Sequence, residues 1–150
     1  MATKTIEEAL VAKLENVMSS LVDDRIFPDS YPQSEDGESS PWPCVVYQRA
    51  GDDDLITLDG TRSSVRIDVY TVEIWSASRS DCERGRNLLK EAFSGVNCRG
   101  YWGGAEGTGV FVLGAIARDA AADAEPPIQG DEELDRAERL TVTVTWNSDW

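Results

Sequence analysis

The sequence predicts an α+β fold, in which a mainly antiparallel sheet of four or five strands carries two helices packed on one face. Two segments, residues 5–21 and 80–94, show helical periodicity behind a capping sequence. The remaining apolar segments are short, β-prone and separated by hairpin-compatible connections. The chain has 150 residues without an internal repeat or a linker, so a single domain over residues 1–150 is expected.

The first helix is expected close to the N-terminus. Thr5 followed by Glu8 forms a capping box, which satisfies backbone N–H groups at a helix start. Apolar residues then recur on one face at Ile6, Ala9, Leu10, Leu14, Val17, Met18 and Leu21. Asp23 breaks this pattern, and prolines frame residues 28–42 as a long surface loop.

Two strands are expected before the second helix. Residues 44–49 form a β-prone run, which should enter a turn at Gly51 and the three aspartates that follow. Residues 65–75 supply the next strand. Within it the apolar parity changes, from Val65, Ile67 and Val69 to Val72 and Ile74, which predicts either a bulge or a strand covered on both sides.

The second helix should begin at a capping box formed by Ser80 and Glu83 and end before Gly95. The glycine-rich residues 100–109 lack the Gly-Lys-Ser/Thr ending of a phosphate loop, so a flexible hairpin or loop is expected there. A strand follows over residues 110–117. Residues 119–135 resemble a second long loop, and residues 140–146 alternate apolar and polar side chains as the last strand.

Composition excludes several classes of function. The chain has no histidine, which excludes a histidine base, a Ser-His-Asp triad and a histidine-bound metal. The formal charge of −14 disfavours tight DNA binding, because phosphate contacts need Lys and Arg. Cys44, Cys82 and Cys98 are odd in number and far apart, so they are expected to be reduced thiols, with Cys44 and Cys82 buried. We expect no cofactor and no metal.

The chain also lacks the signals of membrane insertion and export. No apolar run approaches the roughly 20 residues of a membrane span, and the N-terminus lacks a secretory signal. Synthesis in the cytoplasm is therefore expected.

Two charged clusters and one tryptophan are candidate contact residues. The cations Arg79, Arg84, Arg86 and Lys90 decorate the second helix. They could face acidic loops of a neighbouring copy or form a solvated helix face. Most acids gather in residues 23–41, 51–59 and 119–138, all expected to be loops. The adjacent Asp52, Asp53 and Asp54 are interpreted as a solvated turn, with carboxylate catalysis or a weak cation site as alternatives.

The five tryptophans divide into two expected groups. Trp75 and Trp146 lie in the predicted strands and should be core residues. Trp42, Trp102 and Trp150 could be exposed contacts, and Trp42 is a candidate interface residue. No basic stripe interleaves with these aromatics, so a nucleic-acid stacking platform is not predicted.

The order of segments resembles a known protein family. The first helix is followed by Leu21-Val22-Asp23-Asp24-Arg25-Ile26-Phe27-Pro28, Pro32-Gln33, Pro43-Cys44-Val45-Val46-Tyr47-Gln48, Leu58-Asp59-Gly60, Val65-Arg66-Ile67-Asp68-Val69-Tyr70 and a helix rich in Ala, Arg and Leu. In this order and spacing the chain resembles the tail-completion proteins of tailed bacteriophages, the group that includes tail-to-head joining proteins. The resemblance covers about Leu10 to Phe93 and the closing strand from Arg139 to Trp146.

The resemblance implies a structural virion protein without an active site. Such a protein forms a ring, commonly a hexamer, at the head-proximal end of the tail tube, where it terminates the tail and joins the head connector. The implied partners are further copies of itself, the tail tube protein and a connector or head-closure protein, in the neck of a virion made in a bacterial cytoplasm. Residues 28–42, 51–64 and 119–135 are expected to include the contact surfaces.

Acidic surface suits this role, because DNA must pass through a neck lumen without binding to it. Three alternatives remain from the sequence. The nearest is a head-closure or minor tail protein of the neck. An acidic DNA-mimic inhibitor would need carboxylates in ordered rows on helices or strands, and a carboxylate-dependent hydrolase would need a specific pair of acids.

Overall fold

The computed structural model describes residues 4–23, 25–29, 43–56, 62–76, 78–119 and 136–148. The helices are α1 (Ile6–Val22) and α2 (Arg79–Ala92), with a short 3₁₀ turn η1 (Val96–Cys98). The strands are β1 (Ile26–Pro28), β2 (Cys44–Ile56), β3 (Arg62–Ser76), β4 (Ser94–Gly95), β5 (Gly100–Trp102), β6 (Val110–Asp119) and β7 (Arg136–Asn147).

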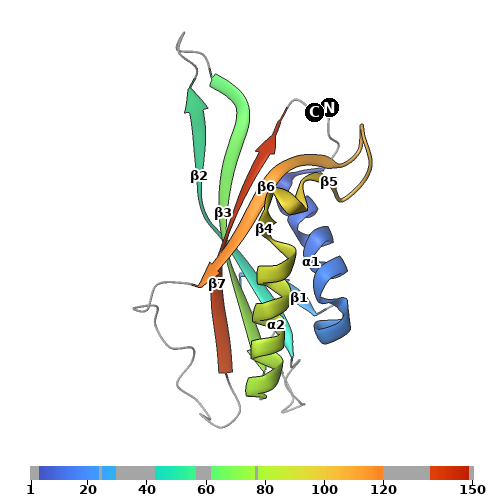
Figure 1. The fold of residues 1–150 in the computed structure, drawn as a ribbon, viewed down its shortest axis with the longest axis vertical. Coiled ribbons are helices and arrows are strands. Elements are labelled where there is room, and N and C mark those ends of the chain that lie inside the picture. Colours follow the sequence, from blue (N-terminus) through green and yellow to red (C-terminus); the bar gives the residue numbers. More distant parts are fainter. Residues whose placement is uncertain are drawn as a thin grey trace.

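The strands form one sheet with the order β1-β2-β3-β7-β6-β4, and β5 pairs with β6 beside β4. Every pairing is antiparallel except that of β1 with β2. Both helices lie on the same face of this sheet (Figure 1). The predicted α+β class and helix placement are confirmed, but the sheet has seven strands instead of four or five. The short strands β1, β4 and β5 account for the difference, because two or three residues carry no readable period.

The first helix forms where its capping sequence predicts. The Thr5 hydroxyl accepts a hydrogen bond from the Glu8 backbone N–H at 3.1 Å, which satisfies a donor that the helix start leaves unpaired. The buried side of α1 comprises Ile6, Ala9, Leu10, Leu14, Met18, Leu21 and Val22. At Asp23 the backbone φ is 57°, and this left-handed residue ends the helix.

The second helix begins two residues before the predicted capping box. Ser78 is its N-cap and accepts from the backbone N–H of Asp81, so the assignment of Ser80 with Glu83 as the cap was wrong. Ser78 and Asp81 have the same three-residue spacing and equivalent chemistry, which explains the misassignment. Farther along α2, Gly85 is buried against its neighbours, since a Cβ there would lie 2.9 Å from Ile74 Cδ1 and 3.1 Å from Leu21 Cδ2.

The predicted turn at Gly51 is not a turn. The strand β2 continues through it to Ile56, and the aspartates at positions 52–54 pair with β3. A register shift between Arg49 and Gly51 accommodates the change, so the glycine marks a β-bulge. The loops expected at residues 28–42 and 119–135 lie outside the described residues, apart from Pro28, Asp29 and Asp119.

The change of apolar parity in β3 reflects neither a bulge in β3 nor a strand covered on both sides, the two predicted explanations. Pairing with β7 runs from Val65 to Ser76 without a register shift, so β3 contains no bulge of its own. Tyr70, Val72 and Ile74 point toward the helices and are buried in the main core. Val65, Ile67 and Val69 have the opposite parity and therefore lie on the face that the helices do not cover.

The glycine-rich segment forms the predicted hairpin. β5 pairs antiparallel with β6, and residues 103–109 connect them. Trp102 was expected to be an exposed contact, but its side chain is buried and its indole donates to the Cys98 carbonyl at 3.1 Å. Trp75 is buried as predicted, and Trp146 packs against the core while partly exposed. Trp42 and Trp150 lie outside the described residues.

All three cysteines are free thiols and all are buried. The prediction of buried Cys44 and Cys82 is thus confirmed, and Cys98 joins them. Burial raises the pKa of the Cys44 thiol to about 12, against the opposing effect of the nearby Arg25 cation. In the described part of the chain, neither helix has the length and apolarity of a bilayer-crossing segment.

The contact at Gly85 yields a stability prediction. Replacing Gly85 by Val should lower the free energy of unfolding by about 2 kcal/mol, because the added methyl groups force Ile74 and Leu21 out of their packing positions. Urea denaturation followed by circular dichroism measures the change. The matched control is Asn87→Val on the exposed side of the same helix, which introduces the same side chain without the steric conflict. Because glycine has a lower helix propensity than valine, helix propensity alone would favour Gly85→Val. Equal stability of the two variants would contradict the packing role of Gly85.

Candidate functional site

The predicted basic cluster on α2 is partly neutralised within the chain. Arg86 donates to both carboxylate oxygens of Asp119 at 2.7 Å each, and Lys90 donates to the same carboxylate at 2.8 Å. These hydrogen bonds hold the pKa of Asp119 well below its usual range and raise the pKa of Arg86. Asp119 ends β6, so this contact attaches α2 to the end of a strand.

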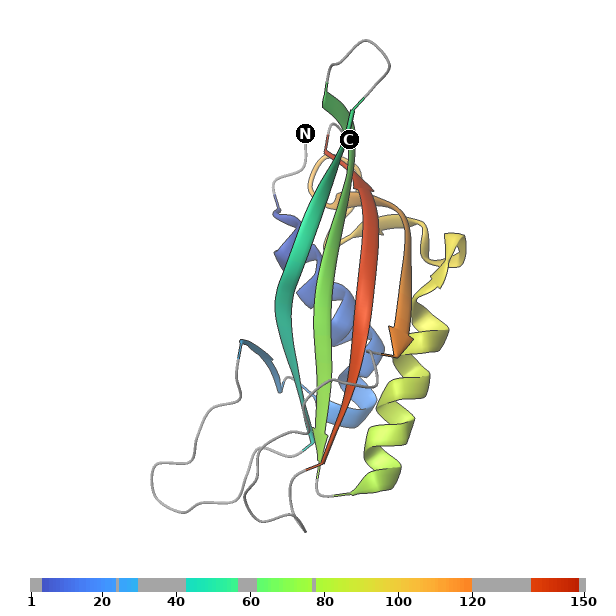
Figure 2. The ribbon, with the colours of Figure 1, turned by 90° about the vertical axis from the view of Figure 1, so that its left-hand side faces the viewer.

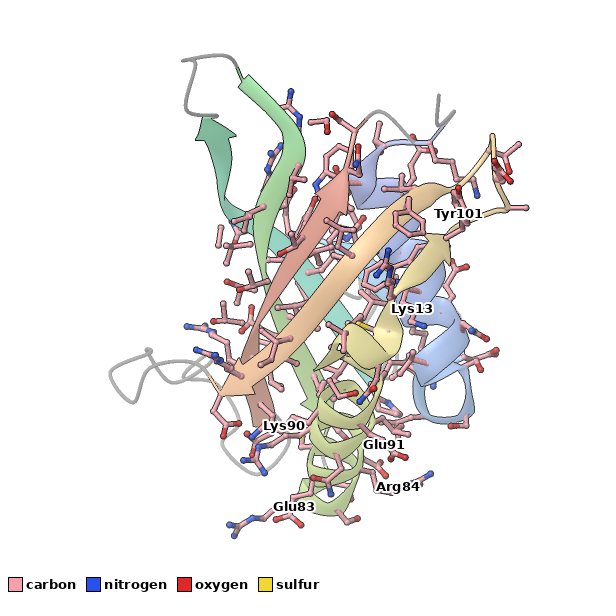
Figure 3. The ribbon with its side chains drawn as sticks, turned by 45° about the horizontal axis from the view of Figure 1, so that its top comes forward. Lys13, Glu83, Arg84, Lys90, Glu91 and Tyr101 are labelled. Carbon is pink, nitrogen blue, oxygen red and sulfur yellow. The ribbon has the colours of Figure 1, made fainter. Side chains whose placement is uncertain are left out.

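The two remaining cations of the cluster lie farther out. Arg79 and Glu83 are both exposed and lie 3.6 Å apart in an i, i+4 pair. Arg84 is exposed on α2 and extends from a different side of the helix than Glu83 (Figure 3). Among the described residues Arg84 has no ion pair, so it is the cation of this cluster most available to a partner.

The acidic part of the predicted interface lies on a strand. In the backbone register Asp52, Asp53 and Asp54 stand opposite Asp68, Ile67 and Arg66 of β3. Their side chains and the whole of Trp42 lie outside the described residues, so their predicted contacts stay predictions. No group of three or more metal-ligating side chains occurs in the part of the chain that the structure describes.

A large surface that the sequence did not single out is the face of the sheet turned away from the helices. Figure 2 looks onto this face, with both helices behind the strands. Three central strands align here in rows, in which Val69 stands opposite Thr143 and Thr143 opposite Ile116. We call this surface the open face, and its members are Val65, Ile67, Val69, Thr71, Gly114, Ile116, Thr141, Thr143 and Thr145.

None of these nine members is charged, although 28% of the chain is charged. The exposed Arg118 stands opposite Thr141 at one end of the face. The side chains of the open face are partly exposed, with Ile116 38% exposed, and Val96 of the adjoining turn η1 is 76% exposed. A shallow groove of about 380 Å³ runs between Val96 and the threonines, lined also by Leu113. Charged side chains occur at the border of the open face, where Arg139 pairs with Glu73 at 3.1 Å.

One charge in this part of the sheet is buried on the opposite side. Asp68 is 2% exposed and accepts hydrogen bonds from Arg49 at 2.5 Å and from the Trp146 indole at 2.6 Å. These contacts join β2, β3 and β7 on the side of the sheet opposite the open face. Burial, and then the neighbouring Asp68 charge, raise the pKa of Tyr70 to about 12.

A second groove lies between α1 and the start of β2. It has a volume of about 360 Å³ and is lined by Lys4, Glu7, Glu8, Val11, Ala12, Glu15 and Tyr47. The Tyr47 hydroxyl donates a hydrogen bond to Glu7, and burial, followed by the Glu7 charge, raises the pKa of Tyr47. The groove therefore combines apolar side chains with three carboxylates and one cation, Lys4.

Sequence reasoning missed the open face, although a signal for it was present. The parity change at Val65, Ile67 and Val69 marks apolar side chains that cannot point at the helices. It also missed Asp119 as the partner of the α2 cations, because that residue was assigned to a loop. Asp119 lies 33 positions from Arg86 and 29 positions from Lys90 in the sequence, so these contacts leave no local pattern there.

Comparison with known proteins gives distant structural likenesses alone. No family model and no curated protein matches this chain. Its fold is similar to that of a chain in the virion of a native gene transfer agent particle, with 13% identity, a TM-score of 0.44, and coverage of 93% of this chain and 92% of that one. A likeness at this level is too distant to transfer a function.

The Asp119 contacts predict a dependence of stability on pH. Because the folded pKa of Asp119 is lowered, its contribution is present above the unfolded value of about 4 and is lost as the pH falls below it. Asp119→Asn should therefore cost no more than about 1 kcal/mol at neutral pH, since the carboxylate is half-exposed. At pH 3 and below, the difference should shrink steadily.

Denaturant unfolding at several pH values measures this difference. Glu106→Gln is the control, because Glu106 is exposed on the β5–β6 connection and far from the α2 cations. A cost for Asp119→Asn that stayed constant through the acid range would show that the ion pairs do not stabilise the fold.

Proposed function

We propose that this chain is a structural subunit of a phage-type virion, and specifically a tail-completion or tail-terminator protein that acts by forming a ring. The order of sequence segments from Leu10 to Phe93 supports the family. The proposed ring, with a hexamer as the expected form, closes the head-proximal end of the tail tube and offers a docking surface to the head connector. The proposed role involves no catalysis.

The open face is the observation that carries this proposal. A sheet face exposed permanently to water would be expected to carry charged side chains, whereas this one combines valine, isoleucine and threonine. Depletion of charge at the centre is typical of protein–protein interfaces, and an exposed apolar patch indicates a contact surface. In a chain of net charge −14, a patch of uncharged side chains at the centre of three strands, with charges only at its ends, is best explained by a stable protein partner.

Ring assembly uses two different surfaces of each copy, because neighbours meet head to tail. The open face supplies one of them. The second surface and the contacts with the tube and the connector are proposed to include Arg84 and residues 28–42 and 119–135. The acidic composition keeps the proposed lumen from holding DNA as it passes.

A charge placed on the open face tests the proposal. Thr143 lies at its centre, and its half-buried side chain can be replaced by Glu without disturbing the core. We expect Thr143→Glu to fold normally but to be missing from assembled particles, because the interface would bury an unpaired charge. The matched control, Asn87→Glu on the exposed side of α2, should be incorporated normally.

Electron microscopy of particles made with and without this protein provides the measurement. The expected result is a ring of copies at the head-proximal end of the tube, with overlong or headless tails in its absence. A position on the head side of the neck would favour a head-closure protein. Absence of the chain from particles, or normal incorporation of Thr143→Glu, would overturn the proposal.

A further inference from the structure

Two arginines mark the two ends of the open face along β6. The guanidinium carbon of Arg99 lies 5.4 Å from the centroid of the Phe111 ring, and Phe111 stands opposite Asn147 on the open side of the sheet. Arg118 stands opposite Thr141 at the other end. Both arginines are exposed, and among the described residues neither has an ion-pair partner. The uncharged centre of the face therefore lies between two positive charges.

The shallow groove beside Val96 occupies the stretch between these arginines. It is lined by residues 113–116 of β6 and by Thr143 and Thr145 of β7, and its volume is about 380 Å³. Gly114 contributes no side chain to this lining. Arg118 follows Phe111 by seven residues, which corresponds to about 23 Å of extended strand. The groove is thus a mainly apolar hollow with a cation near each end.

The outward side of α1 carries the complementary pattern. Residues at helical spacings of three and four form one row, which we call the α1 row: Glu8, Ala12, Asn16, Ser19 and Asp23. The buried residues of α1 lie on the other side of the helix, and every member of the row except Ala12 is fully exposed. The row is uncharged in the middle and has a carboxylate at each end. From Glu8 to Asp23 it spans about 22 Å, close to the separation of the two arginines.

The other charges of α1 lie outside this row. Lys13 is turned toward the hairpin, where its Nζ lies 5.6 Å from the centroid of the Trp102 ring. Lys4 and Glu15 line the separate groove beside Tyr47. The α1 row and the open face lie on opposite sides of the molecule, because α1 packs behind the sheet (Figure 2).

We propose that the open face of one copy binds the α1 row of a second copy, head to tail. The small side chains of Ala12 and Asn16 enter the groove beside Val96, as a helix ridge enters a groove. Arg99 and Arg118 meet the carboxylates at the two ends of the row. This inference rests on the proposed function, because it names the partner of the open face and makes the α1 row the centre of the second ring surface.

Charge selects the head-to-tail arrangement over the symmetric ones. Two open faces packed on each other would bring the arginines of both copies together, and two α1 rows would bring carboxylates together. Only the contact of an open face with an α1 row places opposite charges at both ends. Because the two surfaces differ, each bound copy still offers one free surface, so association continues into a ring or a chain.

Sedimentation of the purified full chain tests the arginines. At about 0.15 M salt the long-range repulsion between these acidic copies is screened, while close ion pairs keep their effect. We expect concentration-dependent association, which Arg99→Gln combined with Arg118→Gln should weaken about tenfold. The control, Ser80→Glu combined with Asn87→Glu on the exposed side of α2, changes the net charge by the same amount and should weaken association less than about twofold.

The acids of the α1 row are tested in the same way. Glu8→Gln keeps a capping-box residue, and Asp23→Asn suits the left-handed backbone at that position. Together they should weaken association about tenfold, although they lower the net repulsion between copies. The control pair Glu91→Gln and Glu106→Gln removes the same charge from exposed positions elsewhere and should not weaken association.

Disulfide cross-linking identifies which surfaces meet. One variant carries Ile116→Cys on the open face and another carries Asn16→Cys in the α1 row, and the natural cysteines are buried. After mixing and mild oxidation, the disulfide between the two variants should be the main product. Replacing Asn16→Cys by Asn87→Cys, on the exposed side of α2, should give little of the mixed product.

Three results would overturn the inference. These are a chain that is still monomeric at about 1 mM, equal weakening by the variants and their controls, and a main product that links two Ile116→Cys copies to each other. The proposed function has a separate test. If Thr143→Glu were missing from particles while the purified chain stayed monomeric, the structural role would stand, and the open face would bind another virion protein instead of a second copy.

Discussion

The packing of both helices on one face of the sheet determines most of the remaining structure. Side chains alternate strictly along a strand, so a face buried under α1 and α2 commits every second residue of β3 and β7 to the other side. On the covered side, Tyr70 and Val142 lie in a continuous apolar core. The centre of the opposite side carries valine, isoleucine and threonine, which suit a surface that becomes buried in an assembly.

The sequence predicts the long elements well because their periodicity is long enough to detect. The helix from Ile6 and the strand through Leu140 repeat their patterns over several turns or pairs. It fails at Gly51, where glycine and aspartates resemble a turn but β3 supplies the hydrogen bonds that extend the strand. The contact of Arg86 with Asp119 was out of reach, because only the folded chain brings them together.

The distribution of charge follows a related logic. Buried or paired charges serve the fold: Asp68 joins three strands through Arg49 and Trp146, and Asp119 attaches α2 to β6. Such pairing uses cations that are scarce in a chain with 14 Lys and Arg against 28 Asp and Glu. With twice as many acids as cations, the chain favours partners that bring positive charge.

The burial of all three cysteines has a practical consequence for locating this subunit in a larger assembly. A thiol reacts as the thiolate, and burial that raises the pKa of Cys44 to about 12 keeps that form rare at neutral pH. A cysteine introduced at an exposed position, such as Glu106 on the β5–β6 connection, would then be the readily accessible thiol. Maleimide dyes or gold clusters could thus mark one chosen point of the native fold without removal of any natural cysteine.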